Sequence, residues 1–191
     1  MRLLITAALG IFLSFSSLAK QNLYSLDSEL SALSFATTKL QYVIEPASIT
    51  GLTGGTDQSG KLKIEVPIAN LDTGVPIRNE RLNKLFFTSE VFPTAIVEAS
   101  IPGGILDKSL VVTQQTIPAK VTLFGNSQDI QFKVNIVKTN DVLAVSTVAP
   151  VIVRGSGFGI PADNLAALAQ TVGGISISDA VPVTFSLILK K

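Results

Sequence analysis

Residues 61–68 read KLKIEVPI, in which every second side chain from Leu62 to Ile68 is apolar and most of the others are charged. Residues 129–136, DIQFKVNI, repeat this alternation. A period of two is typical of an antiparallel strand with one buried face and one wet face. The two segments therefore predict an all-β protein.

Weaker alternation and turn residues extend the pattern along most of the chain. Further strands are expected at 32–36, 94–101, 119–124, 142–154 and 183–189. Turns are expected at 51–60, 102–104, 125–127 and 139–141, which are rich in Gly, Asn, Asp, Ser and Pro. Short strands at such spacing predict a single barrel or sandwich domain over residues 20–191.

Two segments depart from the strand pattern and predict short helices. Residues 78–87 carry Arg, Asn, Glu, Lys and Leu, and residues 162–172 place apolar side chains at 165, 168, 169 and 172. This second spacing forms one apolar stripe, which must lie on another surface. We expect that surface to be the strand at 142–153, because both of its faces are apolar and need cover from the helix or from a second subunit.

The composition excludes several classes of site. The 191 residues include no cysteine and no histidine, so thiol nucleophiles, disulfides and Ser-His-Asp triads are absent, and neither a catalytic residue nor a metal site is predicted. The formal charge is only +1. Without a basic cluster, nucleic acid is not expected as a partner.

The first 19 residues have the features of a secretory signal peptide. Arg2 precedes an apolar run, and Ser17 and Ala19 occupy the −3 and −1 positions of a cleavage site between Ala19 and Lys20. The run is shorter than the roughly 20 residues of a membrane-spanning helix. We expect a protein exported to the periplasm without an integral membrane span after cleavage.

Three stretches together resemble the YceI-like family of bacterial periplasmic lipid-binding proteins. The first combines IANLDTG at 68–74 with RNERL at 78–82, LFF at 85–87 and Phe92-Pro93. The second is VTLFGNS at 121–127, and the third is RGSGFGI at 154–160. Asn79 and Arg81 stand where the family commonly has Asp and His, so any shared polar or metal chemistry is not carried over.

The resemblance implies an eight-stranded antiparallel, lipocalin-like barrel with one or two short helices. It also implies a non-enzymatic protein that holds a long isoprenoid or similar lipid, with a bound isoprenoid or quinone in place of a cofactor. The inward parity of the strands and the aromatic residues near a barrel mouth give the expected ligand-binding set. Its members are Leu33, Phe35, Ile64, Val66, Phe86, Phe87, Phe132, Val134, Phe158 and Phe185.

Alternation alone does not distinguish a hollow barrel from one whose side chains fill the axis, and the resemblance favours the cavity. Arg78, Asn79 and Arg154 are candidates for binding a lipid head group, although arginines at strand ends also form structural ion pairs with carboxylates such as Asp72.

Two other functions remain open at this level. The Asp72-Thr73-Gly74 triplet occurs in aspartic proteases, which would require a dimer to supply the second carboxylate. The second alternative is a structural or stress-related periplasmic protein with a filled core. The sequence leaves open whether the lipid binder itself forms a homodimer.

Overall fold

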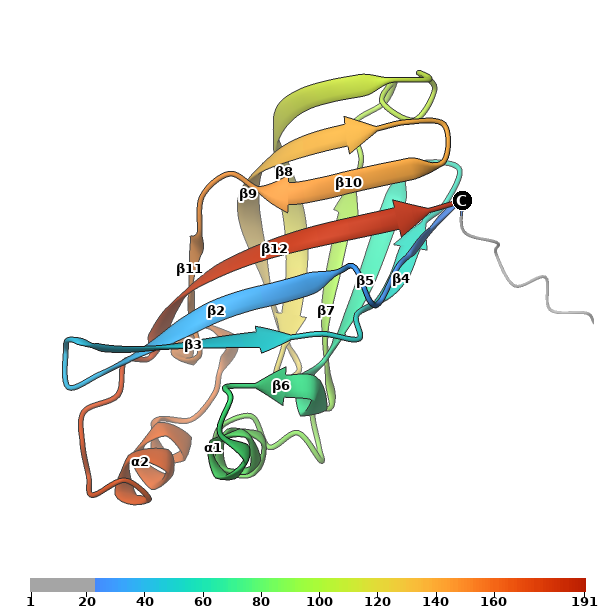
Figure 1. Cartoon of the computed structure of the whole chain (residues 1–191). Helices are drawn as coiled ribbons and strands as arrows, with labels where there is room; N and C mark the ends of the chain where they lie inside the picture. Colours follow the sequence, from blue (N-terminus) through green and yellow to red (C-terminus); the bar gives the residue numbers. More distant parts are fainter. Residues whose placement is uncertain (1–22) are drawn as a thin grey trace, which may run out of the picture.

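The computed structural model describes residues 23–191 and shows an antiparallel barrel with two helical segments at one end (Figure 1). The expected signal peptide, residues 1–19, lies outside the described residues. The strands are β1 (Tyr24–Leu26), β2 (Ala32–Lys39), β3 (Val43–Ile49), β4 (Thr53–Thr56), β5 (Lys61–Pro67), β6 (Leu71–Asp72), β7 (Thr94–Ser100), β8 (Val111–Leu123), β9 (Asn126–Lys138), β10 (Val142–Thr147), β11 (Val151–Arg154) and β12 (Ala180–Lys190).

These segments form a closed ring of eight strands. The ring runs β1-β4-β5-β7-β8-β9-β10-β12, and β12 pairs with β1 to close it. Strands β2 and β3 extend this sheet as a hairpin beside β12, and β11 pairs with the first half of β12. Because each strand of the ring pairs antiparallel to the next, the predicted eight-stranded antiparallel barrel is confirmed.

The glycine-rich segment 51–60 was expected to be a turn throughout, and this prediction was wrong for its first half. Residues Thr53–Thr56 form β4, which pairs with β5. Gly54 has φ of +128°, and a Cβ on it would lie 2.0 Å from the carbonyl oxygen of Lys63. Glycine is therefore required here because the two backbones approach so closely, not because the chain turns.

The region 142–154 is two strands and not one. β10 ends at Thr147 and β11 begins at Val151, with residues 148–150 between them. Pro150 has no N–H to donate to a sheet, which explains why the ladder breaks at this point. Strand β8 begins at Val111, well before the expected residue 119.

The first predicted helical segment consists of α1 (Pro76–Arg81) and a π-helical turn, η2 (Leu82–Phe86). Pro76 stands in the first turn of α1, where its missing N–H leaves no helical hydrogen bond unmade. Helix α2 (Ala162–Gln170) follows the short helical turn η3 (Ser156–Phe158).

Helix α2 does not cover β10, contrary to our expectation. It packs on η2, where the Asn164 side-chain amide donates hydrogen bonds to Phe86 O at 2.9 Å and Thr88 Oγ1 at 3.4 Å. Leu168 points into the core from the same helix. The apolar stripe of α2 is thus buried against the end of the barrel. The helix does not cover the strand region 142–153, and Ile152 on β11 is 57% exposed.

The end of the barrel remote from the helices is filled by side chains. Tyr24, Ile136, Leu143 and Leu189 are completely inaccessible to solvent there. The hydroxyl of Tyr24 donates to Asn140 O at 3.2 Å. Lys138, on the inward side of β9 and only 3% exposed, donates to Thr139 O at 3.2 Å and to Lys108 O. We refer to this region as the filled half.

Candidate functional site

The other half of the barrel is hollow, and its wall extends to α2 and η2, which supply Leu165, Leu168 and Phe86. The atom-free space in it is about 1640 Å³ including the solvent at its opening, and the centres of water molecules can occupy about 200 Å³ of that space. We refer to this region as the hollow half and to its end beside α2 and η2 as the mouth. The barrel is therefore neither hollow nor filled along its whole axis, but divided between the two.

All ten residues of the predicted ligand-binding set lie on the cavity wall. Their strands position them by simple alternation: Ile64 and Val66 come from β5, and Phe132 and Val134 come from β9. The aromatic rings of Phe132 and Phe185 meet edge to face, with centroids 5.4 Å apart. The role of these ten residues in binding a ligand stays a prediction.

The phenylalanines of the motifs at 85–87, 92–93 and 154–160 take different positions relative to the cavity. Phe86 and Phe87 line the cavity from the end of η2, with their rings 4.9 Å apart, and Phe158 lines it from η3. Phe92 is absent from the wall because it stacks on Phe124 at 4.1 Å, outside the cavity.

Helix α2 supplies part of the wall that the strand pattern did not indicate. Leu165 and Leu168 line the cavity, and Ile177 joins them from the loop before β12. The 3.6-residue spacing in this helix did signal an apolar face. This spacing did not indicate that the apolar face of α2 would lie across the mouth.

The wall is almost entirely apolar. Its polar members are Thr37, Ser178 and Asp179, all near the mouth. The Asp179 carboxylate accepts hydrogen bonds from the Ser156 N–H and hydroxyl, so it fixes the loop that leads into η3. A cavity with so few polar partners cannot hold a polar molecule by hydrogen bonds, but it offers a large apolar surface to a hydrocarbon.

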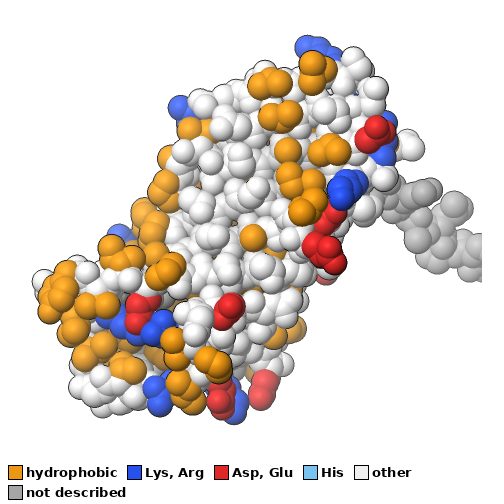
Figure 2. Space-filling view, viewed as in Figure 1, with side chains coloured by type: hydrophobic (Ala, Val, Ile, Leu, Met, Phe, Trp, Pro, Cys, Tyr) orange, Lys and Arg blue, Asp and Glu red, His pale blue; other side chains and the backbone are white. Residues whose placement is uncertain are grey.

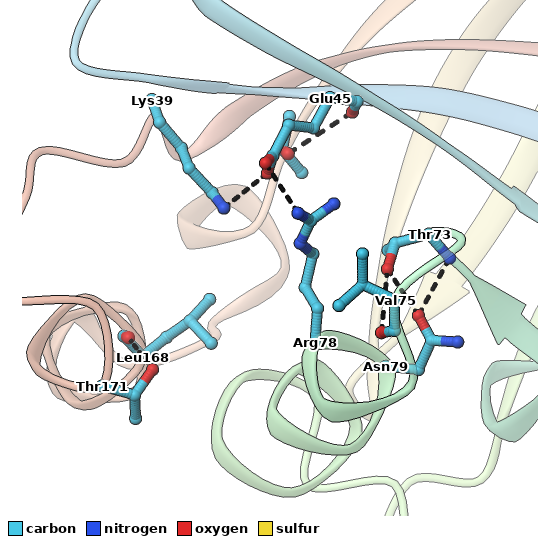
Figure 3. Close-up of polar contacts among 9 residues, drawn as sticks. Lys39, Glu45, Thr73, Val75, Arg78, Asn79, Leu168 and Thr171 are labelled. Atoms are coloured by element: carbon cyan, nitrogen blue, oxygen red, sulfur yellow. Dashed lines mark hydrogen bonds and ion pairs between the residues drawn. The ribbon is translucent and has the colours of Figure 1, made fainter.

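A group of three charged side chains lies next to the wall residue Thr37, which pairs with Glu45, although none of the three lines the cavity itself (Figure 3). Lys39 and Glu45 extend from the β2–β3 hairpin toward the helices, and Arg78 points from α1 toward Glu45. The Arg78 Nη2–Glu45 Oε1 distance is 2.7 Å, and Lys39 Nζ forms an ion pair with Glu45 Oε2. We refer to these three residues as the mouth cluster.

The three head-group candidates differ in their surroundings. Arg78 is in the mouth cluster. Asn79 has a structural role, because its Oδ1 accepts from the Thr73 N–H at 2.9 Å and the Thr73 hydroxyl at 2.6 Å. Arg154 lies on the outward side of β11, while its neighbours Val153 and Gly155 line the cavity. The geometry thus favours Arg78 among the three.

Glu45 and Lys39 were not among the sequence candidates. Both follow the parity of the cavity wall, because Glu45 pairs with Thr37 and Lys39 lies two residues further along β2. The signal that could have found them is the presence of charged residues on an otherwise apolar parity. It was weak because β3 was not recognised as a strand.

The surroundings of Asp72 do not suit an aspartic protease. Its Oδ1 accepts from the Gly74 N–H at 2.8 Å and from Asn79 Nδ2 at 3.1 Å. The hydrogen bond from Gly74, followed by that from Asn79, lowers the pKa of this exposed carboxyl. Protease chemistry instead requires two carboxyls that share a proton, with one pKa raised. Asp72 is better explained as the acceptor that closes its own turn.

Other kinds of site are not indicated in the described part of the chain. Within residues 23–191, no three acidic side chains lie close enough to hold a metal ion. No helix among these residues has the length and apolar character needed to cross a membrane. The outer surface carries an apolar patch over the tip of the β2–β3 hairpin (Figure 2), where Leu40, Tyr42, Val43 and Ile44 are exposed.

The fold and the cavity define an antiparallel, lipocalin-like barrel with an apolar interior. The sequence matches the family model described as the YceI-like domain over residues 24–189, nearly all of the described chain. The chain therefore belongs to the YceI-like family, as its motifs predicted. A search of curated proteins found no match.

Solved structures share the fold at low sequence identity. A polyisoprenoid-binding domain from Saccharophagus degradans is 21% identical, with a TM-score of 0.82 over 89% of this chain and 99% of that one. Burkholderia cenocepacia BcnA is 15% identical, with a TM-score of 0.63 over 85% and 98%. The YceI protein of Campylobacter jejuni is 17% identical, with a TM-score of 0.51 over 78% and 88%.

Proposed function

We propose that this protein binds a long isoprenoid or similar lipid in the hollow half of its barrel, without catalysing a reaction. The observation that carries the proposal is the apolar cavity, whose wall includes all ten residues of the predicted ligand-binding set. Membership of the YceI-like family and the similarity to a polyisoprenoid-binding domain support it.

The physical basis is burial of hydrocarbon. Leu33, Phe35 and Phe185 are only partly buried, although they point into the barrel, because their side chains meet cavity space. Transfer of a lipid tail from water contributes about 0.8 kcal/mol for each CH₂ group. The loss of freedom of the tail and of the whole ligand offsets part of this gain, so the affinity is smaller than the area suggests.

The proposed location is the periplasm, reached by cleavage of the signal peptide between Ala19 and Lys20. This rests on the sequence of residues 1–19 and on the resemblance to a periplasmic family. N-terminal sequencing of the protein from a periplasmic extract would test it, with Lys20 as the expected first residue. A first residue at Met1 would contradict it.

The direct test of binding is solvent extraction of the purified protein followed by mass spectrometry. We expect an isoprenoid lipid or quinone to be recovered at a fixed ratio to protein. A protein that is empty after purification and also takes up no prenylated quinone in a titration would contradict the proposal.

A substitution in the deep part of the cavity makes this test specific. Ala99 lines the cavity from β7, and Ala99→Phe would shorten the space available to the tail. We expect the variant to retain short-chain prenyl ligands and to lose long-chain ones. Ile96→Phe is the matched control, because Ile96 faces outward on the same strand and is not part of the wall. Equal chain-length dependence in both variants would place the tail elsewhere.

A further inference from the structure

The mouth cluster lies between the β2–β3 hairpin and α1, beside the cavity wall, because Glu45 pairs with the wall residue Thr37. Lys39 and Glu45 share the parity of the cavity-lining residues Phe35 and Thr37. Arg78 approaches from the opposite side (Figure 3). The side chains of Lys39, Glu45 and Arg78 are 15%, 22% and 25% exposed, so a ligand at the mouth would meet them with limited screening by water.

The charges of the mouth cluster and of the cavity wall cancel. Lys39 and Arg78 carry two positive charges, and Glu45 carries one negative charge between them. Asp179 on the cavity wall adds a second negative charge. An incoming phosphate would therefore find no net positive charge among these four residues, and it would have to displace Glu45 from both of its partners.

An uncharged head group faces no such competition. In the described residues, Arg78 uses its Nη2 for Glu45, and its remaining N–H groups have no partner within the protein. These N–H groups can donate to a carbonyl, ether or hydroxyl oxygen while the ion pairs stay intact. The hydrogen bonds would be charge-assisted and stronger than those between neutral groups.

We propose that Glu45 determines the head-group specificity of this protein, favouring uncharged oxygen-bearing head groups over phosphates on the same isoprenoid tail. Glu45 acts by neutralising Lys39 and Arg78, which would otherwise form an anion site. This inference rests on the proposed function, because it requires the tail to occupy the hollow half.

The test compares two probes with the same prenyl chain, a prenylated benzoquinone and a prenyl monophosphate. We expect the unmodified protein to bind the quinone at least about tenfold more tightly than the phosphate. Glu45→Gln should tighten phosphate binding by about tenfold and change quinone binding less than about twofold. The gain should disappear as salt is added, because it is electrostatic.

Glu98→Gln is the matched control. Glu98 is exposed on the outer face of β7, so its variant has the same change in charge and should keep the original preference. Lys39→Gln provides a second, opposite test, because removal of one cation should weaken phosphate binding further. It also keeps the inference testable if Glu45→Gln does not fold.

Several outcomes would overturn the inference. The phosphate could bind the unmodified protein as tightly as the quinone does, or Glu45→Gln and Lys39→Gln could leave the ratio of affinities unchanged. Failure of the unmodified protein to bind either probe is a different result, since it contradicts the proposed lipid binding itself.

Discussion

The filled half and the hollow half of this barrel share strands β9, β10 and β12 but differ in what surrounds their inward side chains. In the filled half, Tyr24 and Lys138 are buried and their polar atoms donate to backbone carbonyls. In the hollow half, apolar side chains such as Phe35 and Phe185 remain partly uncovered around a cavity. The difference indicates that close packing in the filled half stabilises the barrel, while the other half leaves the space in which we propose that a lipid binds.

This division explains why a hollow protein can be stable. A cavity reduces the packing energy of the folded state in proportion to its size, because the wall atoms lack contact partners on one side. In this barrel the loss of packing energy is confined to the hollow half. The ring closes in the filled half, where Ser25 and Leu26 of β1 pair with the last residues of β12.

The largest effect should come from opening a hole in the filled half. Tyr24→Ala removes a completely buried aromatic ring and should lower the free energy of unfolding by about 3 to 5 kcal/mol, as measured by urea denaturation. Tyr24→Phe keeps the ring and loses the hydrogen bond to Asn140, so a cost of about 1 kcal/mol is expected. Equal costs for the two variants would show that packing at this end is not what stabilises the barrel.

The next effect should appear in ligand exchange and not in stability. Phe86 lines the cavity beside the mouth and is only partly buried, so Phe86→Ala should speed ligand release by about tenfold. Stopped-flow displacement of a fluorescent prenyl probe would measure this rate. Leu85→Ala, on the same turn but outside the wall, serves as control. An unchanged release rate in Phe86→Ala would contradict the position of the mouth.

A smaller effect is expected where α2 is held on η2. Asn164→Ala removes the hydrogen bonds to Phe86 O and Thr88 Oγ1, which should cost about 1 kcal/mol in thermal or urea unfolding. Asn164→Asp keeps the acceptor but loses the amide donor, so it should resemble the alanine variant. A variant as stable as the original would mean that α2 is held by Leu165 and Leu168 alone.

The smallest effect concerns acid stability at the Asp72 turn. Hydrogen bonds from Gly74 and Asn79 lower the pKa of Asp72 below its ordinary value of 3.8. A lowered pKa means that the folded state favours the charged carboxylate, so this contribution is complete above pH 3.8 and is lost as the pH falls through the folded value. Asp72→Asn should therefore flatten the stability curve in that acid range. An identical curve for both proteins would contradict this role.

Much of the barrel could be predicted because alternation reports directly which side of a strand is covered. Ile64 and Val66, or Phe132 and Val134, follow a period of two without error, so their place on the inner surface is fixed as soon as the strand is recognised. The motifs around Asp72 and Phe158 then supplied the family and the number of strands.

Other features depend on contacts between distant segments, which a local pattern cannot show. β4 was missed because Gly54 is needed for close approach to Lys63, a relation visible only after pairing. The position of α2 depends on where η2 lies. The boundary between the filled and hollow halves depends on side-chain volume at both ends, since inward parity is the same for Val134 and Ile136 although only Val134 meets the cavity.

The pairing of β1 with β12 also brings the first described strand and the last one together, at the end opposite the mouth (Figure 1). A linker joined after Lys191 would leave the molecule from that end. A biosensor surface or a fused reporter could therefore be attached there with the opening facing away from the attachment point. A circularly permuted chain that joins these strands and is cut in an outer turn would keep the same wall around the ligand.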